Sequence, residues 1–561
     1  MSPSVRSAAD SVVWDQVVTD LRAGLPGWRA VGLPERIGLL RRLRRRVGEE
    51  AATMAAATRA AQSLPESGLW AAEAWAPAYS VAQVARVLER VLRLVEAGED
   101  PLPAKAIRTR PDGQVVVDVF PATWEDRLLL AGYHGEVWLA PGVTRHQVLS
   151  GASRTYRDSA DSAGVTLLLG AGNAINLVLT DLIHLLYARN SVVAVKMNPV
   201  LAYQRPVVER IFTEFVDRGF VRFVDESIEA GAYLARHPGI DHIHMTGSAN
   251  SHDALVWGTD GAAEDRRAHR TPLIDKTITA ELGGVGPVVV VPGDWTEADI
   301  RRQADLIVYA KLFNSGHICA APQILILPDG WPHADRLLAE IRRLLTTVPA
   351  RDRYYPGSED KVSAVLDRHP QAEPCRGDRN RLVIEGIDPD EDSILFTTEV
   401  FADVLGVARL PAGSIPDYLD AAVTFANDRL TGTLAANLLV DPATANQHAA
   451  AMDQAVADLR YGTIGINEWA VLSYNLGYTT WGAYPGHTPD AIGSGTGVVV
   501  NAYQLPEPRK SLITAAFRPR LKALTSVTHR SVDRLIPKMV RYATTDDRRL
   551  LPGIILTALQ G

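Results

Sequence analysis

The stretch from Gly164 to Met197, GVTLLLGAGNAINLVLTDLIHLLYARNSVVAVKM, holds two short apolar runs separated by a segment with helical periodicity. The runs Gly164–Gly170 and Ser191–Met197 have the length and the Leu and Val content of buried strands, and Ala174–Tyr187 predicts a helix between them. The alternation continues over four further segments: a helix at Arg205–Arg218, a strand at Phe220–Asp225, a helix at Ile228–Arg236 and a strand at His242–Met245. Strands joined by helices of this length form right-handed βαβ units. The fold class is therefore predicted to be α/β, with a parallel sheet covered by helices on both faces.

The segments before this alternation have a different pattern. Residues 10–98 carry Ala and Leu at helical spacing, with five arginines between residues 41 and 46 on one face. The runs Gln114–Phe120 and Glu136–Ala140 are rich in β-branched and aromatic residues and predict strands. We therefore expect a helical N-terminal region followed by a small β element at about residues 110–142.

Composition limits the classes of protein to consider. The chain has 561 residues, 47% apolar and 22% charged, so it can fill two domains of ordinary size, or three. Two cysteines, Cys319 and Cys375, cannot form a disulfide framework, which predicts a reducing compartment and, by default, the cytoplasm. A net charge of -7 without zinc-finger or aromatic RNA-binding motifs argues against nucleic acid as a partner. Residues 1–20 lack a signal-peptide pattern, and polar residues interrupt the apolar stretch Val165–Ala188, so no membrane span is predicted.

Polar groups stand at three strand ends of the predicted sheet. Asn173 follows the first strand, Lys196 lies at the end of the second, and Thr246-Gly247-Ser248 follows the fourth. Ligands bind off the carboxyl ends of such strands, and an amide, an ammonium and a Gly-Ser turn suit a nucleotide cofactor and an oxyanion. Gly170-Ala171-Gly172 begins like a dinucleotide fingerprint, but Ile175 stands at the third glycine position and the next strand ends without an acid. The ordinary Rossmann fingerprint is therefore absent.

Cys319 lies in the string FNSGHICAAP, residues 313–322, 38 positions after Glu281 in Glu281-Leu282-Gly283-Gly284. A thiolate is the strongest nucleophile that a protein carries near neutral pH, and nearby glycines leave room for a bulky acyl intermediate. The pairing suggests a thiol nucleophile served by a carboxylate. The alternative is that Cys319 is a small buried hydrophobic residue.

Taken together, these positions resemble the aldehyde dehydrogenase superfamily, in the same order over roughly residues 160–470. The matching positions are Asn173, Lys196, Thr246–Ser248, Glu281–Gly284, Asn314–Gly316 with Cys319, Thr398–Phe401, Asn427–Asp428, and Gly462–Thr463 with Asn467. The sequence from Cys319 to Pro322 is most similar to the branch that handles fatty and aromatic aldehydes. Trp481–His487 also resembles a stretch found in bacterial members, so the chain looks like a divergent bacterial-type member.

The resemblance implies a catalytic role for three residues. Cys319 would attack the aldehyde carbon, and the Asn173 side-chain N–H and the Cys319 backbone N–H would hold the resulting oxyanion. Hydride transfer to a nicotinamide would leave a thioester on Cys319, and Glu281 would take a proton from the water that hydrolyses it. The alternatives are that Glu281 is an exposed acid at the end of an element and that Asn173 is a turn residue or a helix cap.

The resemblance also implies a cofactor site. Lys196 would bond the adenosine ribose, Glu399 would hold the nicotinamide ribose, and Phe401 would pack against the ring; the remaining cofactor positions are Thr246, Gly247, Ser248 and Leu282. Lys196 could instead be a surface lysine at a strand end. The family often has an acid at the position of Pro199, and without it a 2′-phosphate is not repelled, so NADP is as plausible as NAD.

Two further departures concern histidines. Ser251 and His252 stand where the family has a glycine, which could change how the pyrophosphate sits. His317 stands where the family commonly has Gln, and it could either depress the pKa of the Cys319 thiol or pack locally. His237, His242 and His244 lie near one another without an acid or a cysteine to complete a ligand set, so we predict no metal site.

The resemblance divides the chain into four parts. We expect N-terminal helices and a cofactor domain at 1–281, with the β oligomerisation segment at about 110–142, a catalytic domain at 282–466, a return segment at 467–505 and a basic C-terminal extension at 506–561. The strand after Gly497 would join subunits, giving a homodimer or a tetramer. Between Arg509 and Arg541, nine Lys or Arg residues and one acid alternate with apolar residues, which predicts a basic amphipathic surface helix that docks on the core, on a second subunit or on a membrane.

Three functions remain open at this stage. The first is oxidation of an aldehyde by NAD or NADP with hydrolysis of the thioester, the second is acyl transfer to coenzyme A or reduction of an acyl thioester, and the third is a non-catalytic scaffold. Glu281 favours water as the acyl acceptor, because members that use coenzyme A often lack this base. The sequence does not name the aldehyde, because pocket walls have no fixed spacing and a fold says little about substrate.

Overall fold

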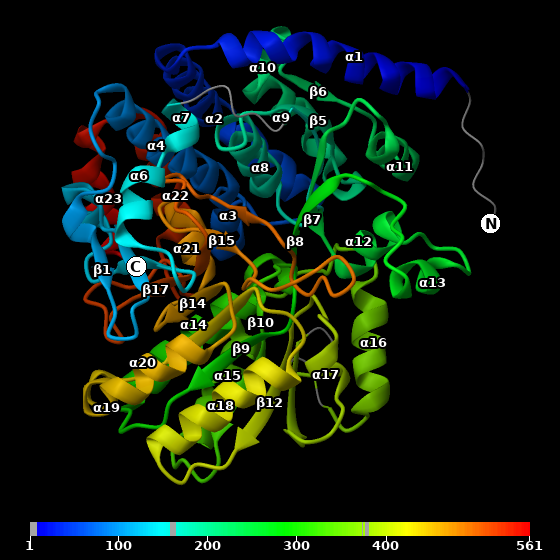
Figure 1. The fold of residues 1–561 in the computed structure, drawn as a ribbon. Helices are drawn as coiled ribbons and strands as arrows, with labels where there is room; N and C mark the ends of the chain where they lie inside the picture. Colours follow the sequence, from blue (N-terminus) through cyan, green and yellow to red (C-terminus); the bar gives the residue numbers. More distant parts are fainter. Residues whose placement is uncertain (1–7, 158–163, 373, 376–380) are drawn as a thin grey trace.

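The computed structural model describes residues 8–157, 164–372, 374–375 and 381–561, and its strands form two large sheets, each covered by helices (Figure 1). The first sheet has five parallel strands in the order β6-β5-β4-β7-β8. These strands are β4 (Val165–Leu169), β5 (Val192–Lys196), β6 (Val221–Phe223), β7 (His242–Gly247) and β8 (Thr277–Leu282). The predicted α/β class and the predicted strands of this region are confirmed.

The helices of the first sheet follow the sequence pattern with one break. They are α8 (Ile175–Tyr187), α9 (Arg205–Ile211), α10 (Thr213–Asp217), α11 (Ile228–Arg236), α12 (Ala249–Val256) and α13 (Ala263–Ala268). The helix predicted over Arg205–Arg218 is divided at Phe212, whose ψ of 12° is outside the helical range. The predicted bounds of α11 are those of the structure.

The second sheet has ten strands in the order β1-β2-β3-β17-β14-β13-β9-β10-β12-β11. From β17 to β11 all pairs are parallel, through β17 (Pro508–Thr514), β14 (Thr463–Ile466), β13 (Ala435–Leu439), β9 (Gly286–Val290), β10 (Pro322–Pro328), β12 (Val404–Leu410) and β11 (Leu382–Ile387). The antiparallel strands β1 (Ile107–Thr109), β2 (Val115–Phe120) and β3 (His134–Leu139) extend this sheet, because β3 pairs with β17. The β segment predicted for oligomerisation is thus paired within the chain, as is β16 (Val498–Val499), which pairs with β15 (Trp481–Gly482).

The next helices lie partly in the lower half of Figure 1, where α14 to α20 are labelled, and partly in its upper left, where α6 and α7 are labelled. They are α5 (Trp124–Leu129), α6 (Arg145–Gly151), α7 (Arg154–Arg157), α14 (Glu297–Leu312), α15 (Ala334–Thr347), α16 (Ser358–Arg368), α17 (Ile394–Thr397), α18 (Ile415–Arg429), α19 (Pro442–Gln447), α20 (Ala449–Asp458) and α21 (Val471–Leu476). Helix α14 leads directly into the loop that carries Cys319.

The N-terminal region is helical, as predicted, and consists of α1 (Ala8–Ala30), α2 (Leu33–Ala61), α3 (Leu69–Glu73) and α4 (Ala76–Glu96). Most of its core side chains belong to the same apolar cluster as the five-stranded sheet, whereas Ala55, Trp70 and Ala74 belong to a cluster of the second sheet. Among the described residues, no helix is both long and apolar enough to cross a membrane.

The predicted basic surface helix after Arg509 is wrong for its first half. Residues up to Thr514 form β17, and a helix starts only at α22 (Val532–Thr545), followed by α23 (Leu551–Ala558). Lys510 is 1% exposed, and its ammonium donates to the carbonyls of Val456, Ala457 and Leu459 at the end of α20. Carbonyl acceptors at a helix end allow a lysine to be buried in a strand, and their residues lie about fifty positions away in the chain.

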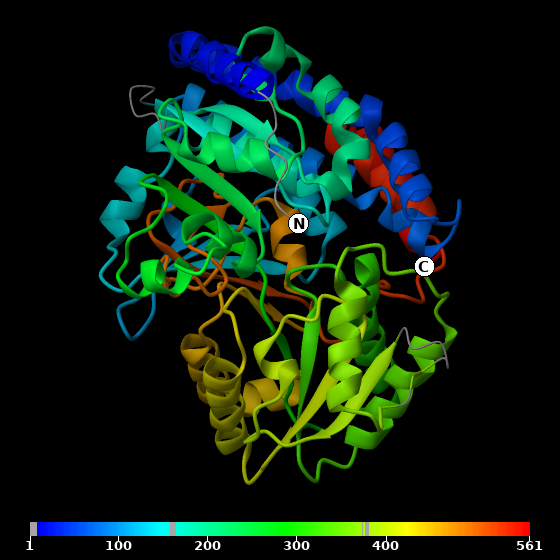
Figure 2. The ribbon, with the colours of Figure 1, turned by 90° about the vertical axis from the view of Figure 1, so that its right-hand side faces the viewer.

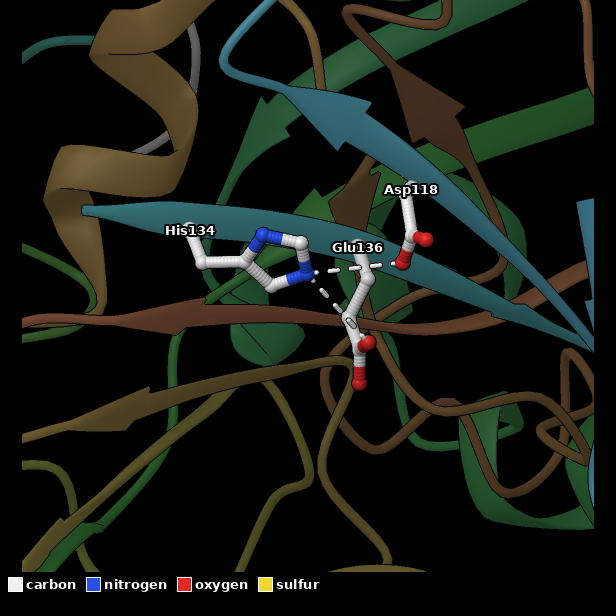
Figure 3. A group of neighbouring side chains, drawn as sticks. All are labelled: Asp118, His134 and Glu136. Atoms are coloured by element: carbon white, nitrogen blue, oxygen red, sulfur yellow. Dashed lines mark ion pairs between the residues drawn. The ribbon is translucent and has the colours of Figure 1, made fainter. Parts of the chain in front are cut away.

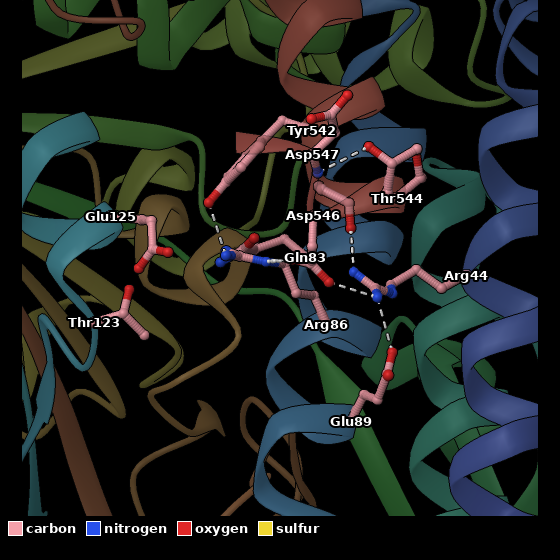
Figure 4. A network of polar contacts seen from close by, with 12 residues as sticks. Arg44, Gln83, Arg86, Glu89, Thr123, Glu125, Tyr542, Thr544, Asp546 and Asp547 are labelled. Carbon is pink, nitrogen blue, oxygen red and sulfur yellow. Dashed lines mark hydrogen bonds and ion pairs between the residues drawn. The ribbon is translucent and has the colours of Figure 1, made fainter. Parts of the chain in front are cut away.

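Helix α22 packs on α4 and α2, so the C-terminal segment joins the N-terminal helices (Figure 2). Asp546, just after α22, accepts from Arg44 on α2 and Arg86 on α4, while Arg86 also donates to Tyr542 (Figure 4). Arg44 Nη2 lies 2.9 Å from Glu89 Oε2 in the same network. Burial would raise the pKa of Asp546, but its hydrogen bonds and charge pairing with the two arginines lower it. The C-terminal segment is therefore bound to this core by the ion pairs of Asp546 with Arg44 and Arg86 as well as by apolar contacts.

Candidate active site

Cys319 sits on a loop with an unusual backbone. After α14, Asn314 and Ser315 have φ values of 53° and 54°, and Gly316 has a φ of 74°. A Cβ on Gly316 would lie 2.5 Å from the carbonyl carbon of Ala402, so no other residue fits this left-handed position. The turn places Cys319 just before β10, at the amino end of that strand.

The loop is held by side chains from distant parts of the chain. The Asn314 N–H donates to Glu73 Oε2 over 2.9 Å, and Glu73 Oε1 lies 2.6 Å from Arg351 Nη1. Asn314 Nδ2 donates to the carbonyls of Asn173 and His317, and the Tyr354 hydroxyl donates to Asn314 Oδ1. Because both side chains of the Glu73–Arg351 pair are at most 7% exposed, the pair is a buried anchor for the loop.

Cys319 and Glu281 line one small cavity of about 20 Å³, together with Asp181, Thr246 and Tyr474. That volume has room for about one water molecule. Glu281, near the end of β8, is 6% exposed, and among the described residues neither of its carboxyl oxygens has a hydrogen-bond partner. Burial, and then the charge of Asp181, raise its pKa well above the usual 4.5. The alternative of an exposed acid does not hold for Glu281.

The thiol itself is partly buried and free of any disulfide. Burial, followed by the charges of Glu399 and Glu281, raises the pKa of Cys319 to about 12. The protonated thiol is thus the stable form in this structure, and a base is needed to make the thiolate.

Asn173 lies between β4 and α8, 8% exposed, and its Nδ2 donates to the His317 carbonyl over 3.0 Å. A side-chain amide has two N–H donors, so the second can serve another acceptor in the cavity that Asn173 and Cys319 share. The N-cap of α8 is Ala174, without a side-chain hydrogen bond. Asn173 is therefore not the cap of that helix.

His317 packs locally. Its Nδ1 bonds the Phe401 carbonyl over 2.7 Å, and its ring lies 5.0 Å from that of Tyr354 and 5.5 Å from that of Phe401. Burial lowers the pKa of His317 to about 3, so the ring is neutral and places no positive charge next to the thiol. Its contact with Phe401, which has a φ of 57°, fixes the neighbouring loop instead.

Several of the predicted cofactor residues surround the same loops. Glu399 Oε1 is buried without a partner, and burial raises the pKa of Glu399 to about 7. A Cβ on Gly283 would lie 2.0 Å from Glu399 Oε1, so the glycine lets this carboxylate approach. Lys196 ends β5, and burial lowers its pKa although nearby acids such as Glu226 oppose the shift. Glu399 thus has an unpaired carboxyl oxygen among the described residues, and Lys196 has a partly buried ammonium at the end of β5.

The remaining predicted cofactor residues differ in surroundings. Gly247 and Ser248 are exposed at the end of β7, where Ser248 caps α12 by accepting from the Ser251 N–H. Thr246 instead donates to Asp181 Oδ2 over 2.9 Å, and Leu282 lines the small cavity beside Cys319. Thr246 and Leu282 thus face the thiol, and Gly247 and Ser248 face solvent.

A larger cavity, of about 90 Å³, extends from the N-terminal helices to Cys319. Its walls come mainly from α2 to α4, the start of α8, and α21, with apolar side chains such as Leu177, Ile318, Val471 and Trp481. Its one ionisable side chain other than Cys319 and the tyrosines is Glu73, which is paired with Arg351.

Sequence reasoning missed Glu73, Arg351, Asp181 and Tyr474. Asp181 had a signal, because it interrupts the apolar stretch Val165–Ala188 on the buried side of α8. No pattern around Glu73 distinguishes it from other acids of the N-terminal helices.

A second group of ionisable side chains lies on β2 and β3 (Figure 3). His134 Nε2 is 3.4 Å from Asp118 Oδ1 and 3.7 Å from Glu136 Oε2, and the three residues have the spacing of a metal-ligand set. The guanidinium of Arg108 contacts both carboxylates. One of their two negative charges is therefore already balanced by the Arg108 guanidinium.

Comparisons with known proteins agree with this arrangement. A family model described as the aldehyde dehydrogenase family matches residues 148–365, which include Asn173, Glu281 and Cys319. N-succinylglutamate 5-semialdehyde dehydrogenase of Sphingopyxis alaskensis is 35% identical over 159 residues, which cover 28% of this chain and 30% of the relative. The aligned part thus spans less than a third of that relative.

Solved structures are similar over most of the chain. Aldehyde dehydrogenase C of Pseudomonas syringae, a mutant in complex with NAD+ and octanal, is 17% identical with a TM-score of 0.59, covering 91% of this chain and 90% of that one. An NAD-dependent aldehyde dehydrogenase of Sinorhizobium meliloti is 17% identical with a TM-score of 0.60, covering 90% and 87%. Betaine aldehyde dehydrogenase of Staphylococcus aureus in complex with NAD+ is 14% identical with a TM-score of 0.60, covering 91% and 88%. The aldehyde dehydrogenase family model thus matches residues 148–365 of this chain, and the solved aldehyde dehydrogenase structures share its fold over 90–91% of its length.

Proposed function

We propose that this protein oxidises an uncharged, largely apolar aldehyde to the carboxylic acid, with NAD or NADP as the hydride acceptor and with hydrolysis of a Cys319 thioester. The observation that carries the proposal is the small cavity between Cys319 and Glu281. It has room for about one water, and both carboxyl oxygens of Glu281 are without a hydrogen-bond partner. A nucleophile, a base and space for the second reactant are what a hydrolysed thioester needs.

The first step is activation of the thiol. Since burial and two nearby carboxylates hold the pKa of Cys319 at about 12, loss of the proton to bulk water is unfavourable. Transfer of this proton to Glu281 creates the thiolate without adding charge to the cavity. The sulfur then attacks the aldehyde carbon, and the free N–H of Asn173 Nδ2 and the Cys319 N–H donate to the oxyanion, each worth roughly 10² to 10³ in rate.

The residues around Phe401 fit a nicotinamide dinucleotide. The orphaned Glu399 Oε1, close against Gly283, is an acceptor for a ribose hydroxyl, and Lys196 at the end of β5 is a donor for the second ribose. When bound, NAD or NADP accepts the hydride. With Pro199 at the position after Asn198, no carboxylate of that loop opposes a 2′-phosphate, so both cofactors remain candidates.

The cavity of about 90 Å³ that reaches Cys319 favours an uncharged, apolar substrate. Apolar side chains form most of its wall, and Glu73, its charged member, is already neutralised by Arg351. A substrate carboxylate would be buried there without a partner, which is costly. The relative from Pseudomonas syringae was solved with octanal, an aldehyde of the proposed class.

We also propose that the protein is cytoplasmic and that it is a homodimer or a tetramer. Two free cysteines suit a reducing compartment. The strands β1 and β11 are the outer strands of the large sheet among the described residues, with Leu382 of β11 in an isolated bridge with Pro374. We take the free edge of β1 as the one available for pairing with a second copy.

The proposal is tested by following the absorbance of reduced nicotinamide with a panel of aliphatic and aromatic aldehydes, with NAD and NADP in parallel and Cys319→Ala as the control. Cofactor reduction that is lost in Cys319→Ala is the expected result. Poor turnover of uncharged aldehydes beside fast turnover of carboxylate-bearing ones would overturn the substrate class. Reduction that requires added coenzyme A would replace hydrolysis by acyl transfer, and no reduction under any condition would favour a scaffold.

A further inference from the structure

In the proposed function, on which this inference rests, Glu281 must lose a proton between two steps of each turnover. Glu281 takes the proton of the Cys319 thiol in the first step, yet it must be a carboxylate again before it can take a proton from the hydrolytic water. The overall reaction, aldehyde, water and NAD+ to carboxylic acid, NADH and a proton, releases one proton per turnover. Since Glu281 is 6% exposed in a cavity of about 20 Å³, this proton needs an exit.

Asp181 is an ionisable group in the wall of that cavity, and its charge acts on Glu281. It lies on α8, is 2% exposed, and lines the same cavity as Cys319 and Glu281. Its Oδ2 accepts from the Thr246 hydroxyl, and its Oδ1 lies 3.7 Å from His244 Nε2. One water or a small side-chain rotation closes a gap of that length. Asp181 therefore stands between the base and a histidine.

His244, on β7, is 1% exposed and faces a second cavity. Its Nε2, on the Asp181 side, has no hydrogen-bond partner, and its Nδ1 bonds the Thr279 hydroxyl over 2.8 Å. His244 and Thr279 line a cavity of about 330 Å³ together with the polar side chains of Thr155, Arg189, Asn501 and Gln504. A cavity of this size and polarity can hold several waters.

The two cavities are neighbours. Gly497 lines the larger one, and a Cβ placed on Gly497 would lie 2.7 Å from Glu281 Oε1. The Glu281 carboxyl is thus close to the wall of the larger cavity, while Asp181 lines the small cavity and His244, 3.7 Å from it, lines the larger one.

The other titratable groups near His244 do not compete for the proton. His184 on α8 has its ring 6.3 Å away, and His242 on β7 shares Thr279 as a partner. Burial lowers the pKa of His184 to about 3 and that of His242 to about 4, so both are neutral near pH 7. Arg189, the remaining charge of this group, lines the larger cavity and cannot be deprotonated.

We propose that Asp181 and His244 form a proton relay from Glu281 to the larger cavity. The proton passes from the Glu281 carboxyl to the Asp181 carboxylate and on to His244 Nε2, while the proton on Nδ1 leaves toward Thr279 and a cavity water. Glu281 is then a carboxylate when the thioester forms. Water adds its hydroxyl to the acyl carbon, the carbon–sulfur bond breaks, Glu281 takes the second proton, and the sulfur regains it as the thiol.

The test separates the first turnover from steady turnover in rapid-mixing measurements of reduced nicotinamide. His244→Ala and Asp181→Asn should keep the first-turnover rate within about twofold, while steady turnover falls roughly tenfold to a hundredfold. The matched control is His242→Ala, on the same strand and with the same Thr279 partner, which should keep steady turnover. The first-turnover amplitude counts folded active sites, so misfolding cannot imitate slow hydrolysis.

Added imidazole provides a readout that a structural role would not change. It should restore steady turnover in His244→Ala, where the deleted ring leaves space beside the larger cavity, and should leave His242→Ala unchanged. Unchanged steady turnover in both relay variants, or a loss in His244→Ala that imidazole does not reverse, would overturn the relay. A wild-type protein that reduces no cofactor would instead overturn the proposed function.

Discussion

Two buried glutamates flank the Cys319 loop, and they differ in every polar contact. Glu73 uses one oxygen for Arg351 at 2.6 Å and the other for the Asn314 N–H at 2.9 Å. Glu281 has no hydrogen-bond partner for either oxygen and faces the small cavity beside the thiol. A buried carboxylate with its partners in place holds structure, whereas one without partners has a perturbed pKa and is typical of reactive sites.

Glu281→Gln is the change with the largest expected effect. The amide has nearly the same shape but cannot take a proton, so steady turnover should fall roughly 10² to 10⁴-fold. Because Glu281 also takes the thiol proton in the proposed mechanism, the first turnover of reduced nicotinamide should slow as well, whereas Cys319→Ala has no first turnover at all. A variant that loses less than about tenfold in steady turnover would show that Glu281 is not the base.

Glu73→Gln should lower the stability of the protein rather than the rate of hydrolysis alone. It leaves the Arg351 guanidinium buried without a counter-charge, and breaking such a pair costs about 3–5 kcal/mol in the free energy of unfolding. The first turnover and steady turnover should decline together, because the whole Cys319 loop loses its anchor. Urea unfolding measures the stability, with Glu66→Gln, an exposed acid of the same region, as the control.

Equal stability of Glu73→Gln and wild type would mean that the pair contributes nothing to the loop. A selective loss of steady turnover with an intact first turnover would assign Glu73 a role in hydrolysis, and the distinction between the two glutamates would then disappear.

The sequence was most informative where the signal is local. The strand and helix alternation of residues 164–245 depends on periodicity within each segment, and the structure follows it closely. Lys510 shows the opposite case, because its burial depends on three carbonyls of a helix end that lies about fifty residues earlier. A charge pattern in one segment cannot contain that information.

The same contrast holds within the candidate site. Cys319, Glu281 and Asn173 could be selected by their motifs, and the structure brings them to one place. Glu73 could not be selected, because its role depends on a long-range contact with Arg351. Asp181 lies between these cases, since a carboxylate within an apolar helix is a visible exception to the pattern. Its partner His244 is identified only in the folded protein, where β7 pairs with β4 and His244 lies 3.7 Å from Asp181.

The pH dependence of the free energy of unfolding is a further test of the difference between Glu281 and Glu73. Because burial raises the pKa of Glu281 well above 4.5, the folded state favours the protonated carboxyl. This preference is fully present below the ordinary pKa and is lost as pH rises through the raised value. Wild type should therefore lose more than about 1 kcal/mol relative to Glu281→Gln over this range, measured by urea unfolding at a series of pH values. Parallel curves for the two proteins would contradict the raised pKa.

The smallest effect on stability is expected from a change next to Glu136. Glu136 is a third carboxylate, and it has several polar partners. It accepts from Trp138 Nε1 and contacts Arg108 and His134. Burial would raise its pKa, but its hydrogen bonds with His134, Trp138 and Arg108 lower it. In return, the hydrogen bond with Glu136 raises the pKa of His134, although burial opposes the shift.

His134→Gln should therefore destabilise the protein only at low pH. A raised pKa in the folded state means that the stabilisation is fully present below the ordinary pKa of 6.5 and is lost as pH rises through the folded-state value. Because the His134 side chain is 48% exposed, solvent screening limits the loss to less than about 1 kcal/mol. Thermal unfolding at acidic and alkaline pH, with the exposed His146→Gln as the control, measures it. Equal destabilisation at both pH values would mean that His134 acts by packing, and that Arg108 alone balances the charge of Glu136.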